Sequence, residues 1–486
     1  MNENVLETAA GARWGRWIGP VLFLIVWIAP TGGLEGNAKL VAGIALWMAV
    51  WWVTEAAPLP ATSLIPIVMF PLLGVQSIRD VTPNYANHMV FLFFGGFVLA
   101  LAVEVSNLHE RVALVVLDTI GSSPRRLVWG FLLVTAGLSM WLSNTATTLM
   151  LLPIAAGVVA RVEDRRAGSR LFLAVAYGAS VGGMATLVGT PPNLVLAGMA
   201  PELLPDLPQL TFGGWILFGL PLVMVLIPIL GLRLGRGLAG GRGGGEAIAV
   251  ARSALGPVTS HEKRAAALFL LTAVAWITRP GFDFGSVHLP GWGELLAHGT
   301  IISDAVPAVA AAVLATLLPA GTRDGRRMIS WVEVHDGVPW GILLLFGGGF
   351  ALADAVRVSG LEHWLADLLG GLAGLPLPFV ILTLCLVTTF TTELTSNTAT
   401  ATLLMPVMAA LSGVLDVPPY LLMVAATLSC SCAFMLPVAT PPNAIVIGSG
   451  HVTPKVMARE GLWLNLVVAV VLTVMVLTWG RVVLPV

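Results

Sequence analysis

The chain has 486 residues, of which 57% are hydrophobic and only 10% are charged, and its formal net charge is −1. A soluble domain carries roughly 25% charged residues, so this composition excludes an ordinary soluble protein and predicts a chain that crosses a membrane many times. The near-zero net charge gives no indication of a nucleic-acid partner.

The apolar segments predict an all-α polytopic membrane protein. A transmembrane helix takes about 20 apolar residues, and about eleven segments are long enough. We expect these spans near 17–30, 40–54, 57–75, 89–118, 171–199, 211–235, 264–279, 301–319, 340–369, 419–448 and 461–483. The runs are continuous rather than alternating, which favours helices over barrel strands. Residues 1–39 are interpreted as an N-terminal segment with an uncleaved first transmembrane helix, because a polar stretch precedes this span and the span has no small-residue cleavage site.

Two further apolar segments, 127–160 and 377–412, carry a polar cluster in the middle. The clusters are Ser143-Asn144-Thr145 and Ser396-Asn397-Thr398. We interpret both segments as re-entrant helical hairpins, because irregular backbone at membrane depth is tolerated where protein or a water-filled cavity surrounds it. Polar groups in lipid are costly, so two copies at matched positions indicate one site built from two halves.

The distribution of basic residues predicts the topology. With a cytoplasmic N-terminus and non-crossing hairpins, 19 of the 25 Lys and Arg residues fall in inner segments, and the outer loops hold none. The inner segments are 1–16, 119–126, 161–170, 233–264, 320–331 and 451–460; the outer loops are 200–210, 280–300, 370–376 and 413–418. This is the asymmetry of the positive-inside rule, and it predicts a multi-pass protein of the inner (cytoplasmic) cell membrane. Counting the hairpins as crossings would place the basic segment 161–170 outside.

The second half of the chain repeats motifs of the first. Gly95-Gly96-Phe97 recurs as Gly348-Gly349-Phe350, and Pro153 recurs as Pro406, both 253 residues later. Gly189-Thr190-Pro191-Pro192-Asn193 corresponds to Ala439-Thr440-Pro441-Pro442-Asn443. An internal repeat of this kind indicates two units of similar structure.

These repeats define the expected domains. The first repeat covers 40–235, with its hairpin at 127–160 and a broken helix at 171–199, and a basic Gly-rich cytoplasmic linker follows at 236–263. The second repeat covers 264–486, with its hairpin at 377–412 and a broken helix at 419–448. Each unit has an odd number of crossings, so the two lie in opposite orientations. Such inverted repeats are typical of secondary transporters with a site near the bilayer midplane.

The paired motifs have a chemistry suited to ions and carboxylates. Two adjacent prolines in a span break the helix, which frees carbonyl oxygens and exposes a helix N-terminus. Carbonyls suit Na⁺, and a helix N-terminus suits a carboxylate. A single copy would be interpreted as a proline kink, and a single Ser-Asn-Thr as small-residue helix packing. Duplication of both motifs favours binding.

No Lys or Arg lies at either predicted half-site. An anionic substrate would therefore be held by neutral donors, helix ends and co-bound cations, which favours cation-coupled transport. Glu393 is the one carboxylate close to a Ser-Asn-Thr cluster, and two roles are open: a coupling carboxylate, or a hairpin cap or buried pair.

The residues that carry these motifs resemble one family. The relevant stretches are 51–60 (WWVTEAAPLP), both Ser-Asn-Thr clusters, both Thr-Pro-Pro-Asn motifs and 431–446 (SCAFMLPVATPPNAIV). Together they resemble the divalent anion/sodium symporters, an INDY-like family of dicarboxylate, citrate and sulfate transporters. The resemblance covers nearly the whole chain in the same order.

The resemblance implies a homodimer whose protomers consist of a scaffold and an elevator-type transport domain, with two or more coupling Na⁺ ions. Carried over by motif, the first sodium site uses Ser139, Ser143, Asn144 and Gly189, and the second uses Thr392, Thr395, Asn397 and Ala439. The substrate carboxylates contact Asn144, Thr145 and Thr190 on one side, and Asn397, Thr398, Thr440 and Pro441 on the other. The family often has Ser where this chain has Thr190, and the added methyl narrows the pocket.

We therefore expect a secondary active transporter that imports C4-dicarboxylates, such as succinate, malate and fumarate, together with sodium. The alternatives on the same site are a sodium-independent dicarboxylate exchanger and a citrate or sulfate transporter. An intramembrane enzyme would need an HExxH motif, a Ser-His pair or two aspartates within the spans, and the motif positions hold none of these. A passive channel would favour a continuous pore over broken, repeated hairpins.

Overall fold

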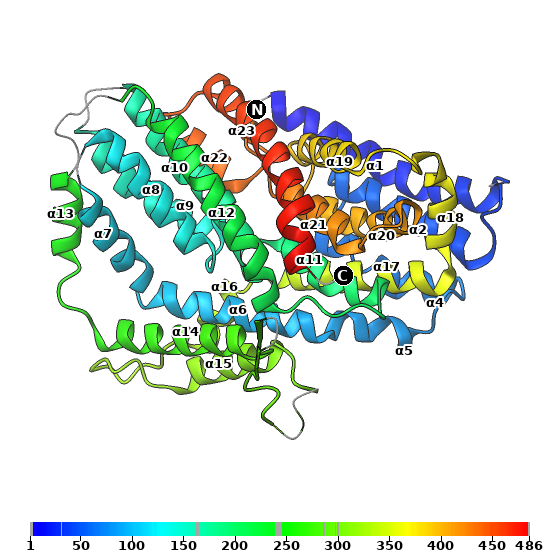
Figure 1. Cartoon of the computed structure of the whole chain (residues 1–486), viewed down its shortest axis with the longest axis horizontal. Coiled ribbons are helices and arrows are strands. Elements are labelled where there is room, and N and C mark those ends of the chain that lie inside the picture. The colour runs from blue at the N-terminus through cyan, green and yellow to red at the C-terminus, as the bar shows by residue number, and fades with distance from the viewer. Residues whose placement is uncertain are drawn as a thin grey trace.

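Helices make up most of the computed structural model, which describes residues 3–30, 32–121, 123–161, 165–238, 245–284, 287–296, 298 and 301–484 (Figure 1). Within these ranges the only strands are β1 (Phe282–Phe284) and β2 (Val287–Leu289), a short antiparallel pair. The all-helical part of the predicted fold class is therefore confirmed.

The first part of the chain is a series of helices separated by short turns. They are α1 (Glu3–Ile28), α2 (Gly36–Thr54), α3 (Leu59–Thr62), α4 (Ile65–Leu72), α5 (Ile78–Val81), the 3-10 turn η1 (Thr82–Ala86), α6 (His88–Val105) and α7 (Leu108–Ile120). The spans predicted as continuous at 57–75 and 89–118 are each broken. Between α6 and α7, Asn107 has φ of 60° and ψ of 16°, a left-handed conformation that a right-handed helix cannot continue through.

The predicted first hairpin and broken helix follow. The elements are α8 (Pro124–Ser139), α9 (Asn144–Val159), α10 (Arg165–Gly182), the 3-10 turns η2 (Gly183–Ala185) and η3 (Leu187–Gly189), α11 (Pro191–Leu203) and α12 (Phe212–Gly235). Helices α8 and α9 have 16 residues each, so each is about 24 Å long. The hydrocarbon core is about 30 Å thick, so this length suits a hairpin better than two full crossings.

The predicted linker is only partly within the described residues. Its Gly-rich centre, 239–244, lies outside them, and the part that follows is helical rather than irregular. The elements are α13 (Gly245–Ala254), α14 (Ser260–Thr278), α15 (Ala305–Leu317) and α16 (Trp331–Gly337). Helix α13 packs against α7 and α9, so the end of the linker is held on the first half of the molecule.

The second half repeats the order of the first. Its elements are α17 (Trp340–Ser359), α18 (Leu361–Leu369), η5 (Gly370–Leu372), α19 (Leu377–Thr392), α20 (Asn397–Leu415), α21 (Pro419–Cys430), α22 (Pro441–Gly448), α23 (Pro454–Met475), the π-helical turn η6 (Val476–Gly480) and α24 (Arg481–Val483). The span predicted at 340–369 is broken at Gly360, whose φ is 73°. Gly360 lies 253 residues after Asn107, so the two halves break at matching positions.

The chain crosses the membrane several times. Among the described residues, six segments are long and apolar enough to span a bilayer, or seven if α18–η5 and α19, which meet at 113°, form one span. The six are Gly36–Thr54, Ile78–Val105, Phe212–Gly235, Trp340–Ser359, Asn397–Leu415 and Pro454–Val483. Asn397–Leu415 is α20 of the predicted second hairpin, so its length allows a full crossing where the prediction has a helix that turns back. The remaining apolar helices are shorter, so the expected total of about eleven spans stays a prediction.

Each half of the chain contributes helices that pack against the other half. Helix α9 of the first hairpin packs against α22, and α20 of the second hairpin packs against α11. Tyr177 on α10 adds a polar link, because its buried hydroxyl lies 3.0 Å from the carbonyl oxygen of Phe434 and 3.1 Å from that of Met457. In Figure 1, α9, α10 and α22 lie in one part of the molecule, and α11, α20 and α21 lie in another. Each hairpin is thereby placed next to a broken helix of the other half.

Candidate ion and substrate site

The tip of the first hairpin is a hydrogen-bonded turn. Ser143 is the N-cap of α9, and its Oγ accepts a hydrogen bond from the backbone N–H of Ala146 at 3.1 Å. Ser139 Oγ, at the end of α8, donates to Asn144 Oδ1 at 2.6 Å. An N-cap serine satisfies a free amide at the start of a helix, and the Ser139–Asn144 bond fixes the direction of the amide side chain. The predicted ligands Ser139, Ser143 and Asn144 are therefore brought together.

The tip of the second hairpin has the same design. Ser396 caps α20, and its Oγ accepts from the N–H of Ala399. Thr392 Oγ1 lies 2.6 Å from Asn397 Oδ1 and 2.8 Å from the carbonyl oxygen of Cys430. A hydroxyl has one proton, so it donates to one of these oxygens at a time. Thr392 thus joins the hairpin tip to the end of α21.

Both helix breaks end at the Thr-Pro-Pro-Asn motif. Helices α11 and α22 each begin at the first proline, and the threonine before it, Thr190 or Thr440, is an N-cap in the β region that makes no side-chain cap bond. Prolines suit the first turn because its backbone amides have no partner within the helix. The prediction that these motifs break their helices is confirmed.

The asparagine of each motif fixes the unwound backbone. Asn193 Nδ2 donates to the carbonyl oxygens of Gly183 and Thr186, at 3.1 and 2.8 Å. In the second half, Asn443 Nδ2 donates to the carbonyls of Ala433 and Leu436, both at 3.0 Å. The three positions correspond one to one between the halves. Sequence reasoning missed this role, although the repeated asparagine was the signal that could have indicated it.

The first hairpin tip and the first break meet at Gly183. A Cβ added to Gly183 would lie 2.9 Å from Asn144 Oδ1, 2.9 Å from the carbonyl oxygen of Gly189 and 3.3 Å from Thr190 Cβ. The predicted residues Asn144, Gly189 and Thr190 therefore surround one point, and a side chain at position 183 would fill it.

Some predicted residues have no side-chain hydrogen bond that links them to these clusters. The side-chain hydroxyls of Thr145 and Thr398 form no hydrogen bond among the described residues, although both lie in the first turn of a hairpin helix. Thr395 Oγ1 lies 2.7 Å from Thr400 Oγ1 and 2.9 Å from the carbonyl oxygen of Thr391. Ala439 and Pro441 flank Thr440 at the second break, where Pro441 is exposed.

Several buried oxygen atoms at the two breaks are unpaired. Asn193 Oδ1, Asn443 Oδ1 and Thr440 Oγ1 have no hydrogen-bond partner among the described residues. A buried acceptor without a partner is costly, so it points to a ligand. The donor set consists of amide, hydroxyl and carbonyl oxygens, which are the ligands that hard cations prefer. The residues present therefore fit Na⁺ as a transported ion.

Glu393 is a clamp on the second break. Its Oε1 accepts from the backbone N–H groups of Phe434 and Met435, at 2.7 and 2.8 Å, and from Asn465 Nδ2 at 2.8 Å; its Oε2 accepts from the N–H of Leu436 at 2.9 Å. The side chain is buried, and no described cation pairs with it. Of the two roles left open, the structure places Glu393 as a cap, here on the unwound backbone rather than on its own hairpin.

The geometry and the composition identify the class of protein. It is a helical, multi-pass membrane protein in which hairpins and broken helices form polar half-sites within an apolar fold. The chain matches the family model described as sodium:sulfate symporter transmembrane region over residues 11–486. The chain therefore belongs to this family, which confirms the resemblance to the divalent anion/sodium symporters and shows that it is a transporter and not an enzyme.

Curated relatives agree with the family. The chain is 38% identical to the sodium-dependent dicarboxylate transporter SdcS of Staphylococcus saprophyticus, over 96% of this chain and 91% of the relative. It is also 38% identical, with the same coverage, to the protein of that name from Staphylococcus aureus.

Solved structures share the fold at low identity. The YdaH transporter of Alcanivorax borkumensis superposes with a TM-score of 0.58 at 16% identity, covering 93% of this chain and 99% of that one. MtrF of Neisseria gonorrhoeae, described with a class of antimetabolite efflux pumps, has a TM-score of 0.58 at 13% identity, covering 94% and 97%. These likenesses concern the fold alone.

Proposed function

We propose that the protein imports C4-dicarboxylates, such as succinate, malate and fumarate, together with sodium ions across the inner cell membrane. The observation that supports this most is the pair of matching half-sites, in which oxygen atoms of a hairpin tip and a helix break converge without a basic residue. The name of the SdcS relatives supports both the sodium dependence and the dicarboxylate.

In the proposed site each asparagine has two faces. The carbonyl oxygen of Asn144 or Asn397 contributes to one sodium ion, and the amide group donates to one substrate carboxylate. Two carboxylates held between two neutral half-sites need co-bound cations to offset their charge, which couples the substrate to sodium. The N-termini of α11 and α22 add partial positive charge where the carboxylates would lie.

The further residues of the site are proposed from the family motifs. Ser139, Ser143 and Gly189 complete the first sodium site, and Thr392, Thr395 and Ala439 complete the second. Thr145, Thr190, Thr398, Thr440 and Pro441 line the substrate. The coupling number is two or more.

The proposed architecture follows the repeats. Residues 40–235 and 264–486 form inverted units that follow the N-terminal segment 1–39 and are joined by the linker 236–263, with the N-terminus in the cytoplasm. Helices α8–α12 and α19–α23 form a transport domain that moves against a scaffold by an elevator mechanism in each protomer of a homodimer. The packing of α9 with α22 and α11 with α20 supports one moving unit, since it ties both hairpins and both breaks together.

The test is succinate uptake into proteoliposomes with an inward sodium gradient. We expect concentrative uptake that disappears when choline replaces sodium. Asn144→Ala and Asn397→Ala should each abolish it, whereas Asn37→Ala, at an exposed position on α2, should transport normally. Uptake unaffected by sodium would contradict the symporter and favour exchange, and normal uptake by either site variant at low sodium would contradict the two-half site.

A sulfate substrate is the second candidate, because the family description names sodium:sulfate symport. A thermal-shift panel of succinate, malate, fumarate, citrate and sulfate, each with sodium and with choline, separates the candidates. Stabilisation by sulfate and not by succinate would reverse the proposal.

A further inference from the structure

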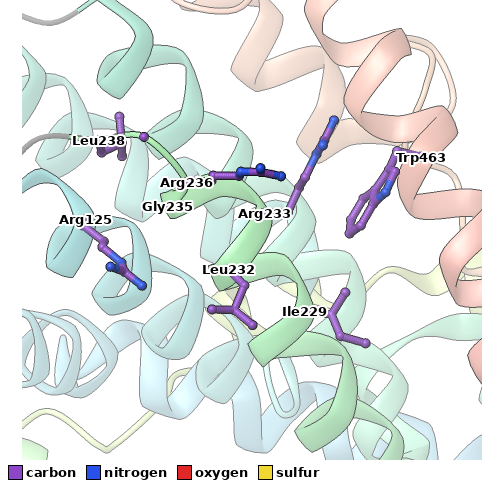
Figure 2. Close-up of a pocket in the computed structure, with 9 residues that line it drawn as sticks. Arg125, Ile229, Leu232, Arg233, Gly235, Arg236, Leu238 and Trp463 are labelled. Atoms are coloured by element: carbon purple, nitrogen blue, oxygen red, sulfur yellow. The ribbon is translucent and has the colours of Figure 1, made fainter.

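A basic pocket lies at the end of α12 (Figure 2). Its volume is about 620 Å³. Besides two glycines, its lining consists of three arginines, one tryptophan and three aliphatic residues: Arg125, Arg233, Arg236, Trp463, Ile229, Leu232 and Leu238. They come from the first turn of α8, from the end of α12 and from α23. None of these residues belongs to the proposed transport site.

The pocket carries more positive charge than its protein partners neutralise. Arg233 is paired, because its Nε lies 2.9 Å from Glu460 Oε2 and its guanidinium lies 5.0 Å from the Trp463 ring centroid. Arg125 and Arg236 are exposed, and neither pairs with an acidic residue in the described part of the chain. The guanidinium groups of Arg125 and Arg236 are therefore available to bind an anion.

The pocket adjoins an apolar surface. Leu217, Met224, Val225 and Leu232 on α12 are 49%, 65%, 42% and 60% exposed. Leu217 and Leu232 each lie seven or eight residues from the adjacent pair Met224 and Val225, which places all four on one face of the helix. On a membrane-spanning helix such a face meets lipid chains. The stripe ends at Leu232, one turn before Arg236, so an apolar surface leads directly to a cationic one.

We propose that this pocket binds the phosphate group of an anionic glycerophospholipid, with its acyl chains along the exposed face of α12. Guanidinium groups match phosphate oxygens in geometry and charge. Tryptophan is common at the membrane interface, and basic pockets between transmembrane helices bind anionic headgroups. A free phosphate would use the same arginines, but the adjoining apolar stripe favours a lipid.

The test uses the full-length protein, purified in a neutral detergent and stripped of lipid. Its melting temperature is measured against added dioleoyl-phosphatidylglycerol, dioleoyl-phosphatidylcholine, glycerol phosphate and inorganic phosphate. We expect saturable stabilisation by phosphatidylglycerol alone. Arg236→Gln should weaken its apparent affinity about fivefold, and the double variant Arg125→Gln with Arg236→Gln about thirtyfold, from the roughly additive contribution of each basic residue.

Arg481→Gln is the matched control, because Arg481 is exposed on α24 and outside the pocket. It should bind phosphatidylglycerol as the wild type does. Melting temperatures in phosphatidylcholine report folding. If the double variant is unstable there, Arg236→Gln decides, since the described residues offer its side chain no hydrogen bond. Equal stabilisation of wild type and pocket variants, or no saturable effect of phosphatidylglycerol, would overturn the proposal. Stabilisation by inorganic phosphate that the variants lose would replace it with a soluble-anion site.

Discussion

Among single residues near the half-sites, Glu393 is a buried carboxylate whose hydrogen bonds hold the second break. It is buried, and its two oxygens accept four hydrogen bonds from the second break and from Asn465. Hydrogen bonds to a charged group contribute about 1.5–3 kcal/mol each, and removing one partner leaves the others unsatisfied. The first half has no such carboxylate: Met140 occupies the corresponding position, and its carbonyl accepts a hydrogen bond from Thr186 Oγ1.

Glu393→Gln should therefore loosen the second half-site selectively. The glutamine places an NH₂ donor against backbone N–H donors, so the unwound segment loses at least one bond. We expect a lower melting temperature and a sodium affinity weakened by about tenfold, from a loss near 1.4 kcal/mol. Thermal shift against sodium concentration measures both. Glu246→Gln removes an exposed carboxylate, whose side chain is 81% exposed, and should change neither. An unchanged sodium response in Glu393→Gln would contradict the clamp.

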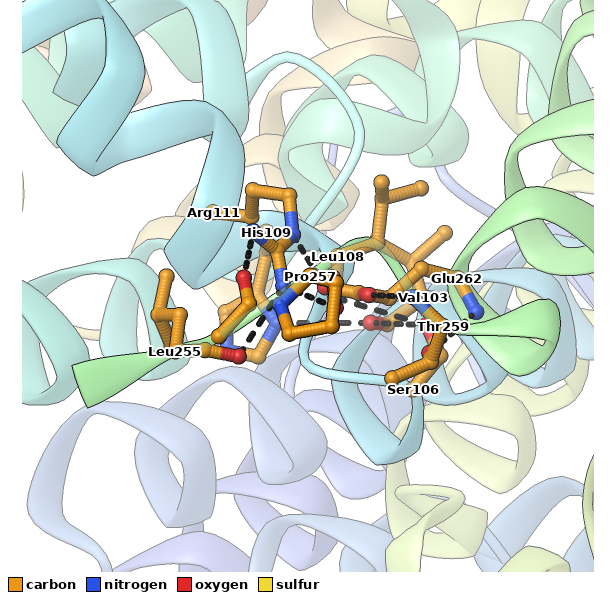
Figure 3. Close-up of polar contacts among 10 residues, drawn as sticks. Val103, Ser106, Leu108, His109, Arg111, Leu255, Pro257, Thr259 and Glu262 are labelled. Atoms are coloured by element: carbon orange, nitrogen blue, oxygen red, sulfur yellow. Dashed lines mark hydrogen bonds and ion pairs between the residues drawn. The ribbon is translucent and has the colours of Figure 1, made fainter. Parts of the chain in front are cut away.

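At the scale of elements, the connection between α7 and α14 depends on one arginine (Figure 3). Arg111 Nε lies 2.6 Å from Glu262 Oε1, and its other nitrogens donate to the carbonyls of Leu255, Gly256 and Pro257. Glu262 also closes the capping box of α14 with Thr259. One guanidinium thus holds the end of the linker, the start of α14 and α7 together.

This connection should be sensitive to acid. Burial alone would raise the pKa of Glu262, but the hydrogen bonds from Arg111 and Thr259 outweigh it, and the pKa lies below the ordinary value of 4.5. The stabilisation is therefore present above pH 4.5 and is lost as the pH falls through the lower folded value. Removing one partner of a buried ion pair lowers the free energy of unfolding by roughly 3 kcal/mol.

We predict that Arg111→Gln lowers the melting temperature at neutral pH and that the difference from wild type shrinks in acid. A series of melting curves between neutral pH and the onset of acid unfolding measures this. Arg481→Gln, at an exposed site, should follow the wild type throughout. A difference that stays constant with pH would show that the ion pair does not act as described.

The sequence predicted the polar elements better than the apolar ones. The Thr-Pro-Pro-Asn motifs identify both breaks, because a proline has no amide to donate and forces its neighbour out of the α region. The ends of α6 and α17 were missed, since 89–118 and 340–369 read as uninterrupted apolar runs. There the break depends on the left-handed conformations of Asn107 and Gly360, which hydrophobicity does not report.

The hydrogen-bond partners of the site residues could not be predicted from the sequence, for a different reason. The motifs indicate that Asn193 and Asn443 matter, but not that each binds two carbonyls of its own break. Likewise, the bond from Tyr177 to Phe434 joins residues that are far apart in the chain, and no local pattern encodes it. The repeated motifs show which residues of the two half-sites correspond. The contacts of those residues depend on how the two halves of the chain pack together, which the motifs do not show.

At the scale of the whole molecule, the repeated glycines lie where the proposed scaffold meets the proposed moving unit. A Cβ added to Gly96 on α6 would lie 3.1 Å from Val188 in η3, beside the first break. One added to Gly349 on α17 would lie 2.8 Å from Thr402 on α20, in the second hairpin. The two glycines are 253 residues apart, so both halves use a residue without a side chain at the same surface. In the elevator proposal this is the surface along which one unit slides past the other.

Gly349→Val should therefore impair movement more than binding. Overpacking at a tight contact costs about 1–3 kcal/mol, which corresponds to a turnover lowered by roughly 5- to 150-fold if the cost falls on the barrier to movement. The half-sites themselves do not include this contact, so sodium-dependent stabilisation by succinate should persist. Uptake rates in proteoliposomes and thermal shifts on the same preparation separate the two effects. Gly413→Val on α20 is the matched control and should transport normally, because an added Cβ there meets no described atom within 4 Å apart from its chain neighbours and its own helix backbone. If Gly349→Val folds poorly, Gly349→Ala makes the same test with a smaller intrusion. Loss of binding and transport together in either variant, with the control intact, would mean that this contact shapes the site and is not a sliding surface.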